Sequence, residues 1–65
     1  MNMSIIPPIY VDADYFPEIE ADPRLAGVVY QHELLPSGKM AIRAADGAGQ
    51  AKIKLLHGGN ISAEN

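Results

Sequence analysis

Two alternating segments on either side of Pro36-Ser37-Gly38 constrain the fold more than any other feature of the sequence. In residues 28–35 and 39–45, apolar side chains recur at every second position, which is the period of a half-buried β-strand. A three-residue hairpin loop needs left-handed backbone at its last position, and Gly38 stands there. The pairs that this loop predicts, all on one face, are Leu34 with Met40, His32 with Ile42, and Tyr30 with Ala44.

A third segment, residues 50–56, also alternates and follows the turn residues Asp46-Gly47-Ala48-Gly49. We interpret residues 50–56 as the third strand of an antiparallel meander. Gln, Ala, Lys and Leu are also good helix formers, so a helix over the same residues is the alternative.

The first part of the chain is predicted to be an extended arm. Residues 4–12 are rich in strand formers, but Pro7 and Pro8 remove two backbone donors and disfavour a central strand. An edge strand over residues 9–12 would add a fourth strand to the sheet. Asp22-Pro23 is typical of a turn or helix start, with Asp at the cap and Pro at the first position.

The predicted fold class is mainly β, a small three- to four-stranded antiparallel meander with an extended acidic N-terminal arm. The arm covers residues 1–24, the meander covers residues 25–59, and a short polar tail covers residues 60–65.

Charge divides the chain at nearly the same place. Residues 1–22 carry five acidic and no basic side chains, whereas residues 23–65 carry three acidic and all five basic ones. An arm of one sign and a body of the other attract each other, within one chain or between copies. The net charge of −3 disfavours general nucleic-acid binding.

The small size of the chain indicates that it associates with a protein partner. Its 65 residues bury too little surface for high stability, and the absence of cysteine excludes disulfides and thiolate metal sites. Association with itself or with a larger protein is the remaining way to stabilise such a chain. No secretion signal or membrane span is visible in the sequence, so we expect a soluble protein made in the cytoplasm.

Two sets of side chains are the candidates for binding a protein partner. Aromatic and branched residues on an arm are typical anchors, and neighbouring carboxylates add charge. The arm set comprises Ile5, Ile6, Ile9, Tyr10, Asp12, Asp14, Tyr15, Phe16, Glu18 and Glu20. The basic set, expected together on the polar face of the sheet, comprises Lys39, Arg43, Lys52 and Lys54.

These features predict a non-enzymatic assembly protein whose arm docks on a neighbouring subunit or on a larger protein assembly. The small size, the aromatic arm and the opposed charges are similar in general design to the cement or decoration proteins of tailed bacteriophage virions. The alternative is a small phage-type inhibitor of a host nucleic-acid enzyme, with the acidic arm as a phosphate mimic. No nucleophile–base pair, ligand cluster or nucleotide loop predicts catalysis, a metal, a cofactor or a small-molecule substrate.

Overall fold

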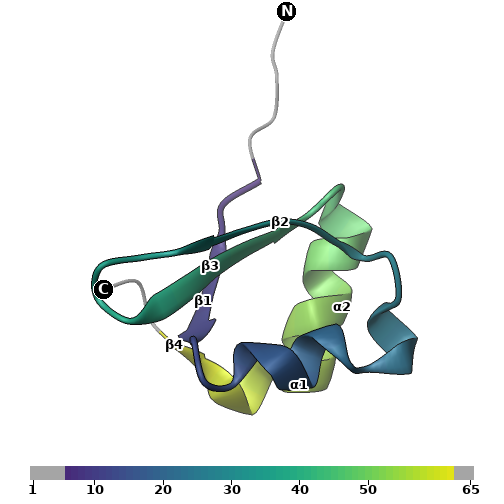
Figure 1. The fold of residues 1–65 in the computed structure, drawn as a ribbon. Helices are drawn as coiled ribbons and strands as arrows, with labels where there is room; N and C mark the ends of the chain where they lie inside the picture. The colour runs from purple at the N-terminus through teal and green to yellow at the C-terminus, as the bar shows by residue number, and fades with distance from the viewer. Residues whose placement is uncertain (1–5, 63–65) are drawn as a thin grey trace, which may run out of the picture.

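The computed structural model describes residues 6–62, which form a four-stranded antiparallel sheet with helices packed on one face (Figure 1). In chain order the elements are β1 (Ile9–Asp12), α1 (Phe16–Glu20), the 3-10 helix η1 (Pro23–Leu25), β2 (Val29–Leu34), β3 (Lys39–Ala44), α2 (Gly47–His57), the 3-10 helix η2 (Gly58–Asn60) and β4 (Ile61–Ser62). The strands lie in the order β2-β3-β1-β4. An antiparallel sheet of up to four strands is therefore confirmed, but helices accompany it and the extended acidic arm is not present over residues 6–24.

The β2–β3 hairpin follows the predicted register over most of its length. Leu34 lies opposite Met40 and His32 lies opposite Ile42, and Gly38 takes the expected left-handed backbone with φ +89°. The predicted pairing of Tyr30 with Ala44 is wrong. A bulge between Val29 and Gln31 places Val29 opposite Ala44 and leaves Tyr30 as the extra residue.

The N-terminal segment is part of the sheet. β1 pairs with β3 through Ile9↔Ile42 and Val11↔Met40, and with β4 through Val11↔Ile61. The predicted edge position is therefore wrong, because the two prolines precede the paired residues and remove no donor from the ladder. Part of the predicted polar tail forms β4. Ile5 and residues 63–65 lie outside the described residues.

Residues 47–57 form a helix, so the predicted third meander strand is wrong and its alternative is confirmed. Asp46 caps this helix, because its Oδ1 accepts the Gly49 N–H at 2.8 Å. Gln50, Ile53 and His57 are buried at helical spacing. Leu55 projects from the helix and is 83% exposed.

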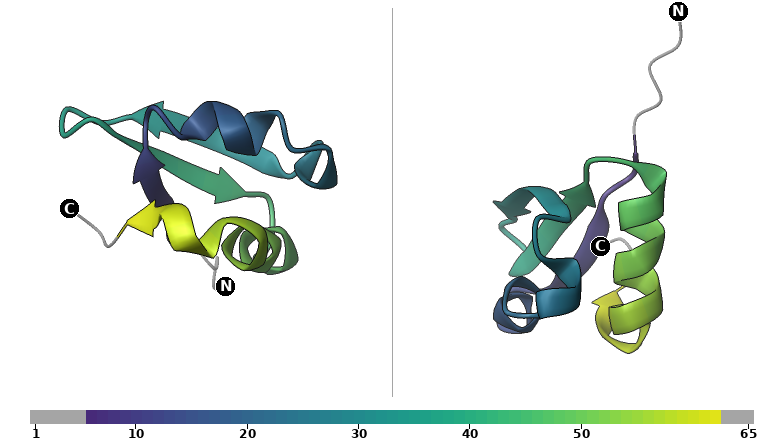
Figure 2. Two further views of the ribbon diagram at one scale, coloured as in Figure 1. Left: turned by 90° about the horizontal axis from the view of Figure 1, so that it is seen from below. Right: turned by 90° about the vertical axis from the view of Figure 1, so that its right-hand side faces the viewer.

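The core lies between the helices and one face of the sheet. Its buried apolar residues are Ile9, Val11, Phe16, Ile19, Leu25, Ile42, Ala44 and Ile53. Alternate residues of β1 and β3 enter this core, while the residues between them face the other way. α1, η1 and α2 lie together on the core side (Figure 2), so the opposite face of the sheet has no helix over it. Neither helix in residues 6–62 has the length and apolar character needed to cross a membrane.

A buried glutamine connects α2 to two other segments. The Gln50 side-chain oxygen accepts the Ala44 N–H at 2.8 Å, and its Nε2 donates to the Pro7 carbonyl. The first bond satisfies the backbone at the end of β3, and the second holds the chain where it enters β1. One neutral amide is suited to this place because it donates and accepts at once.

We expect Gln50→Glu to lower the free energy of unfolding by about 1–3 kcal/mol, because a buried carboxylate loses the donor and faces the Pro7 carbonyl. Gln31→Glu is the matched control at an exposed site and leaves stability within about 0.5 kcal/mol. Urea denaturation of dilute protein measures both values. Equal effects at the two sites would contradict the linking role of Gln50.

Gly49 gives a second test of the packing between α2 and β3. A Cβ at Gly49 would lie 2.8 Å from the Ala44 Cβ and 3.2 Å from Val28 Cγ1, whereas a Cβ at Gly47 meets nothing within 4 Å. We expect Gly49→Ala to destabilise the fold by about 1–3 kcal/mol through overpacking. Gly47→Ala, with its better helix propensity, is expected to leave stability unchanged or slightly raised. Thermal melts of both variants measure the difference, and a stabilising Gly49→Ala would show that helix propensity outweighs the close approach.

Candidate functional site

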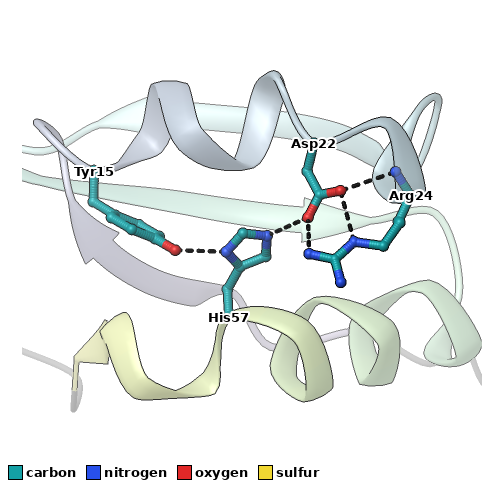
Figure 3. Close-up of polar contacts among 4 residues, drawn as sticks. All are labelled: Tyr15, Asp22, Arg24 and His57. Atoms are coloured by element: carbon teal, nitrogen blue, oxygen red, sulfur yellow. Dashed lines mark hydrogen bonds and ion pairs between the residues drawn. The ribbon is translucent and has the colours of Figure 1, made fainter.

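A chain of polar side chains links the two helical parts of the core (Figure 3). Asp22 caps η1, and its Oδ1 accepts the Arg24 N–H at 2.9 Å. The Arg24 guanidinium adds bonds of 2.9 Å and 2.8 Å to the two carboxylate oxygens. His57, at the end of α2, approaches the same carboxylate with Nε2 at 2.8 Å from Oδ2. Tyr15 completes the chain, with its hydroxyl 2.6 Å from His57 Nδ1.

The partners of His57 define which ring nitrogen carries hydrogen in the neutral side chain. A carboxylate only accepts, so Nε2–H donates to Asp22 and Nδ1 accepts the hydroxyl proton of Tyr15. The rings of Tyr15 and His57 meet edge to face, with centroids 5.7 Å apart. Both Asp22 and His57 are 8% exposed. The buried carboxylate of Asp22 and the buried imidazole of His57 therefore both have hydrogen-bond partners, as stable burial requires.

The carboxylate of Asp22 is stabilised in its charged form. Hydrogen bonds from the Arg24 guanidinium, the Arg24 N–H and His57 hold the pKa of Asp22 far below its usual range, although burial opposes this. The same carboxylate raises the pKa of Arg24 through the hydrogen bonds and the opposite charge.

A Tyr–His–Asp chain has the elements of a general-base relay, since the carboxylate orients the imidazole and the imidazole accepts a proton. Neither of the two principal hollows of the described surface is lined by Tyr15, Asp22 or His57. No group of three or more His, Asp or Glu side chains in residues 6–62 is placed to hold a metal ion. The network is placed to hold α2 against α1 and η1.

The uncovered face of the sheet carries the larger hollow, a shallow groove of about 650 Å³. The residues that line it include Pro8, Tyr10, Tyr30, Gln31, Ala41 and Arg43. The Arg43 guanidinium contacts Gln31 Oε1 at the long distance of 3.5 Å. Its Nε is buried and has no hydrogen-bond partner among residues 6–62. The groove thus combines aromatic surface with a cation that lacks a strong acceptor.

The predicted arm residues are divided among four environments: the core, the groove, the His57 network and the exposed surface. Ile9 and Phe16 belong to the core, with Ile6 half-buried, whereas Tyr10 lines the groove and Tyr15 joins the His57 network. The exposed carboxylates of the set are Asp12, Asp14, Glu18 and Glu20. Asp12 is engaged within the chain, since Lys39 Nζ lies 2.6 Å from its Oδ1.

The predicted basic set does not share one face. Lys39 and Arg43 lie on β3 and point away from the core, but Lys52 and Lys54 are exposed on α2. Their expected common location is wrong because residues 50–56 are helical. Their role in binding stays a prediction.

Sequence reasoning missed His57, which it left without a role. The usable signal was helical spacing, since Gln50, Ile53 and His57 occupy one face of α2. The prediction that Asp22 caps the turn at Pro23 is confirmed.

No family model matches this chain, and no curated protein and no solved structure matches it significantly.

The lowered pKa of Asp22 makes stability depend on acidity. In the unfolded chain Asp22 takes up a proton near its usual pKa of about 3.9, while in the folded chain it resists protonation. Its contribution is complete above that pH and is lost as the pH falls toward its folded pKa. We expect Asp22→Asn to be less stable at pH 7 and to lose less stability than the parent between about pH 5 and pH 2.

Asp14→Asn is the control, because Asp14 is exposed. Its unfolding free energy should follow the parent at every pH when urea midpoints are compared. A pH profile of Asp22→Asn parallel to that of the parent would contradict the assignment.

Proposed function

We propose that this chain is a non-enzymatic assembly protein that binds another protein through the uncovered face of its sheet. The groove lined by Tyr10, Tyr30 and Arg43 is the observation that carries the proposal. Tyr and Arg are the residue types that most often contribute large shares of binding energy in protein interfaces. A shallow, half-open groove suits a segment of a protein better than an enclosed small molecule.

The chemistry of Arg43 indicates what the partner presents. Within residues 6–62 the terminal nitrogen Nη1 of Arg43 has only the long contact to Gln31 Oε1 at 3.5 Å, so a carboxylate or carbonyl oxygen of a partner would give the guanidinium a stronger acceptor. A carboxylate pairs with a guanidinium through two parallel bonds, which fixes orientation as well as affinity. We therefore expect an acidic loop or strand of a larger protein, with its side chains between Tyr10 and Tyr30.

The placement of the possible catalytic groups supports a non-enzymatic role. The Tyr15–His57–Asp22 chain lines neither of the two principal hollows, so a molecule held in either of them would not contact the imidazole. A cement or decoration role on a virion remains a specific form of this proposal, since such a module attaches to a larger protein surface.

The phosphate-mimic inhibitor has less support from the same residues. Asp12 pairs with Lys39, and Asp22 is buried with Arg24 and His57. Only part of the acidic segment is therefore available to a basic target.

The test places a photo-reactive benzoylphenylalanine at Tyr10 in the groove, or at exposed Lys52 on α2 as the matched control. In cells of the source organism, we expect a discrete protein adduct from position 10 and none from position 52. Adding Arg43→Gln should reduce the adduct about tenfold or more, as loss of an interfacial Arg anchor does. Equal adducts from both positions, or an adduct indifferent to Arg43→Gln, would contradict the proposal.

A further inference from the structure

The bottom of the groove on the uncovered face is formed by a small residue, Ala41. It lies opposite Tyr10 of β1 on one side and opposite Glu33 of β2 on the other. Residues directly opposite in an antiparallel sheet have their side chains on the same face, and two strand spacings separate Tyr10 from Glu33 by about 10 Å. Ala41 contributes only a methyl group between these longer side chains and is half-buried. The groove of about 650 Å³ therefore lies over β3, with its walls on β1 and β2.

The groove follows the direction of β3. Arg43 is the next residue of β3 on the same face, and its Cα lies about 7 Å from that of Ala41 at the rise of a strand. It is paired with Gln31 of β2, which also lines the groove. Leu35 lines the other end, since it directly follows β2 at the hairpin turn. A bound segment along β3 thus meets a guanidinium first and apolar surface beyond it.

An extended protein segment matches this spacing. Every second side chain of an extended chain points to the same side, and such side chains also recur about every 7 Å. Two side chains separated by one residue would therefore reach Arg43 and the space over Ala41 at the same time.

The charges of the groove differ at these two positions. Within residues 6–62, Arg43 Nη1 has only the 3.5 Å contact to Gln31, so a carboxylate is the favoured neighbour there. Glu33 stands beside Ala41 and repels a second carboxylate, whereas Tyr10 on the opposite wall offers apolar surface. The first position therefore favours an acidic side chain and the second an apolar one.

We propose that the groove binds an extended segment of a partner protein that carries Asp or Glu two positions from a large apolar residue. The carboxylate pairs with Arg43, and the apolar side chain lies over Ala41 and against Tyr10. This inference rests on the proposed function, because it names the partner chemistry that the same groove accepts. It adds Ala41 as a residue that determines specificity, since its small side chain leaves room for that of the partner.

The first experiment selects random peptides displayed on phage for binding to the immobilised full chain. We expect the enriched peptides to share an acidic residue two positions from a large apolar one. A parallel selection on Arg43→Gln should keep the apolar preference and lose the acidic one. Enriched peptides without this spacing, an acidic preference that persists on Arg43→Gln, or the absence of any enriched family overturns the proposal.

The role of Ala41 is tested with the most enriched peptide and two purified variants. Ala41→Leu fills the groove, whereas the matched control Ala41→Ser leaves it open. We expect Ala41→Ser to bind like the parent and Ala41→Leu to bind at least about tenfold more weakly, while circular dichroism shows both variants folded. Equal binding by a folded Ala41→Leu overturns the place given to the apolar side chain.

A double-mutant cycle tests the carboxylate even if Ala41→Leu fails to fold. Changing the acidic residue of the peptide to its amide should weaken binding to the parent about tenfold and binding to Arg43→Gln by less than about twofold. Equal losses with the two proteins overturn the pairing with Arg43.

The photo-adduct formed at position 10 separates this inference from the proposed function. Loss of the adduct on adding Ala41→Leu supports both. An adduct that depends on Arg43 but is unchanged by Ala41→Leu overturns the two-position inference and leaves the proposed function standing. No adduct from position 10, together with peptides that respond to both substitutions, contradicts the assembly role and leaves the selectivity of the groove supported.

Discussion

The buried contact between Asp22 and His57 joins the two parts of the helical layer on which the core depends. One carboxylate caps η1, binds the Arg24 guanidinium and accepts from the imidazole at the end of α2. A charge held away from water is tolerable here because its oxygens have strong donors. In a chain without cysteine, this network provides a connection between distant segments that small proteins often obtain from a disulfide.

The sequence allowed prediction of those parts of the fold whose signals are local. Gly38 and the alternation around it determine the β2–β3 hairpin, and two of its three predicted pairs are present. Asp22 before Pro23 determines the cap of η1. Each of these features depends on residues within a few positions of one another, where turn chemistry and side-chain period act directly.

The features that were missed depend on ambiguous or distant information. Residues 50–56 satisfy the period of a strand and of a helix, and the Asp46 cap distinguishes the two only when it is considered with the buried positions 50, 53 and 57. In the His57 network, Tyr15 is 42 positions and Asp22 is 35 positions away from His57 along the chain. No local sequence pattern therefore predicts these contacts. The bulge at Tyr30 arises where the chain enters the sheet from η1, and it displaces a pairing that alternation alone would require.

The interactions that stabilise the fold are concentrated on one side of the sheet. The core, the Gln50 bonds and the Asp22–His57 network all lie with the helices, while the uncovered face and the β2 edge take little part in them. Tyr30 and Leu34 are large apolar side chains, yet most of their surface is exposed to water. Exposure of this apolar surface costs free energy in an isolated chain. Because the buried core lies on the helical side, the exposure of Tyr30 and Leu34 supports the proposed contact with another protein surface.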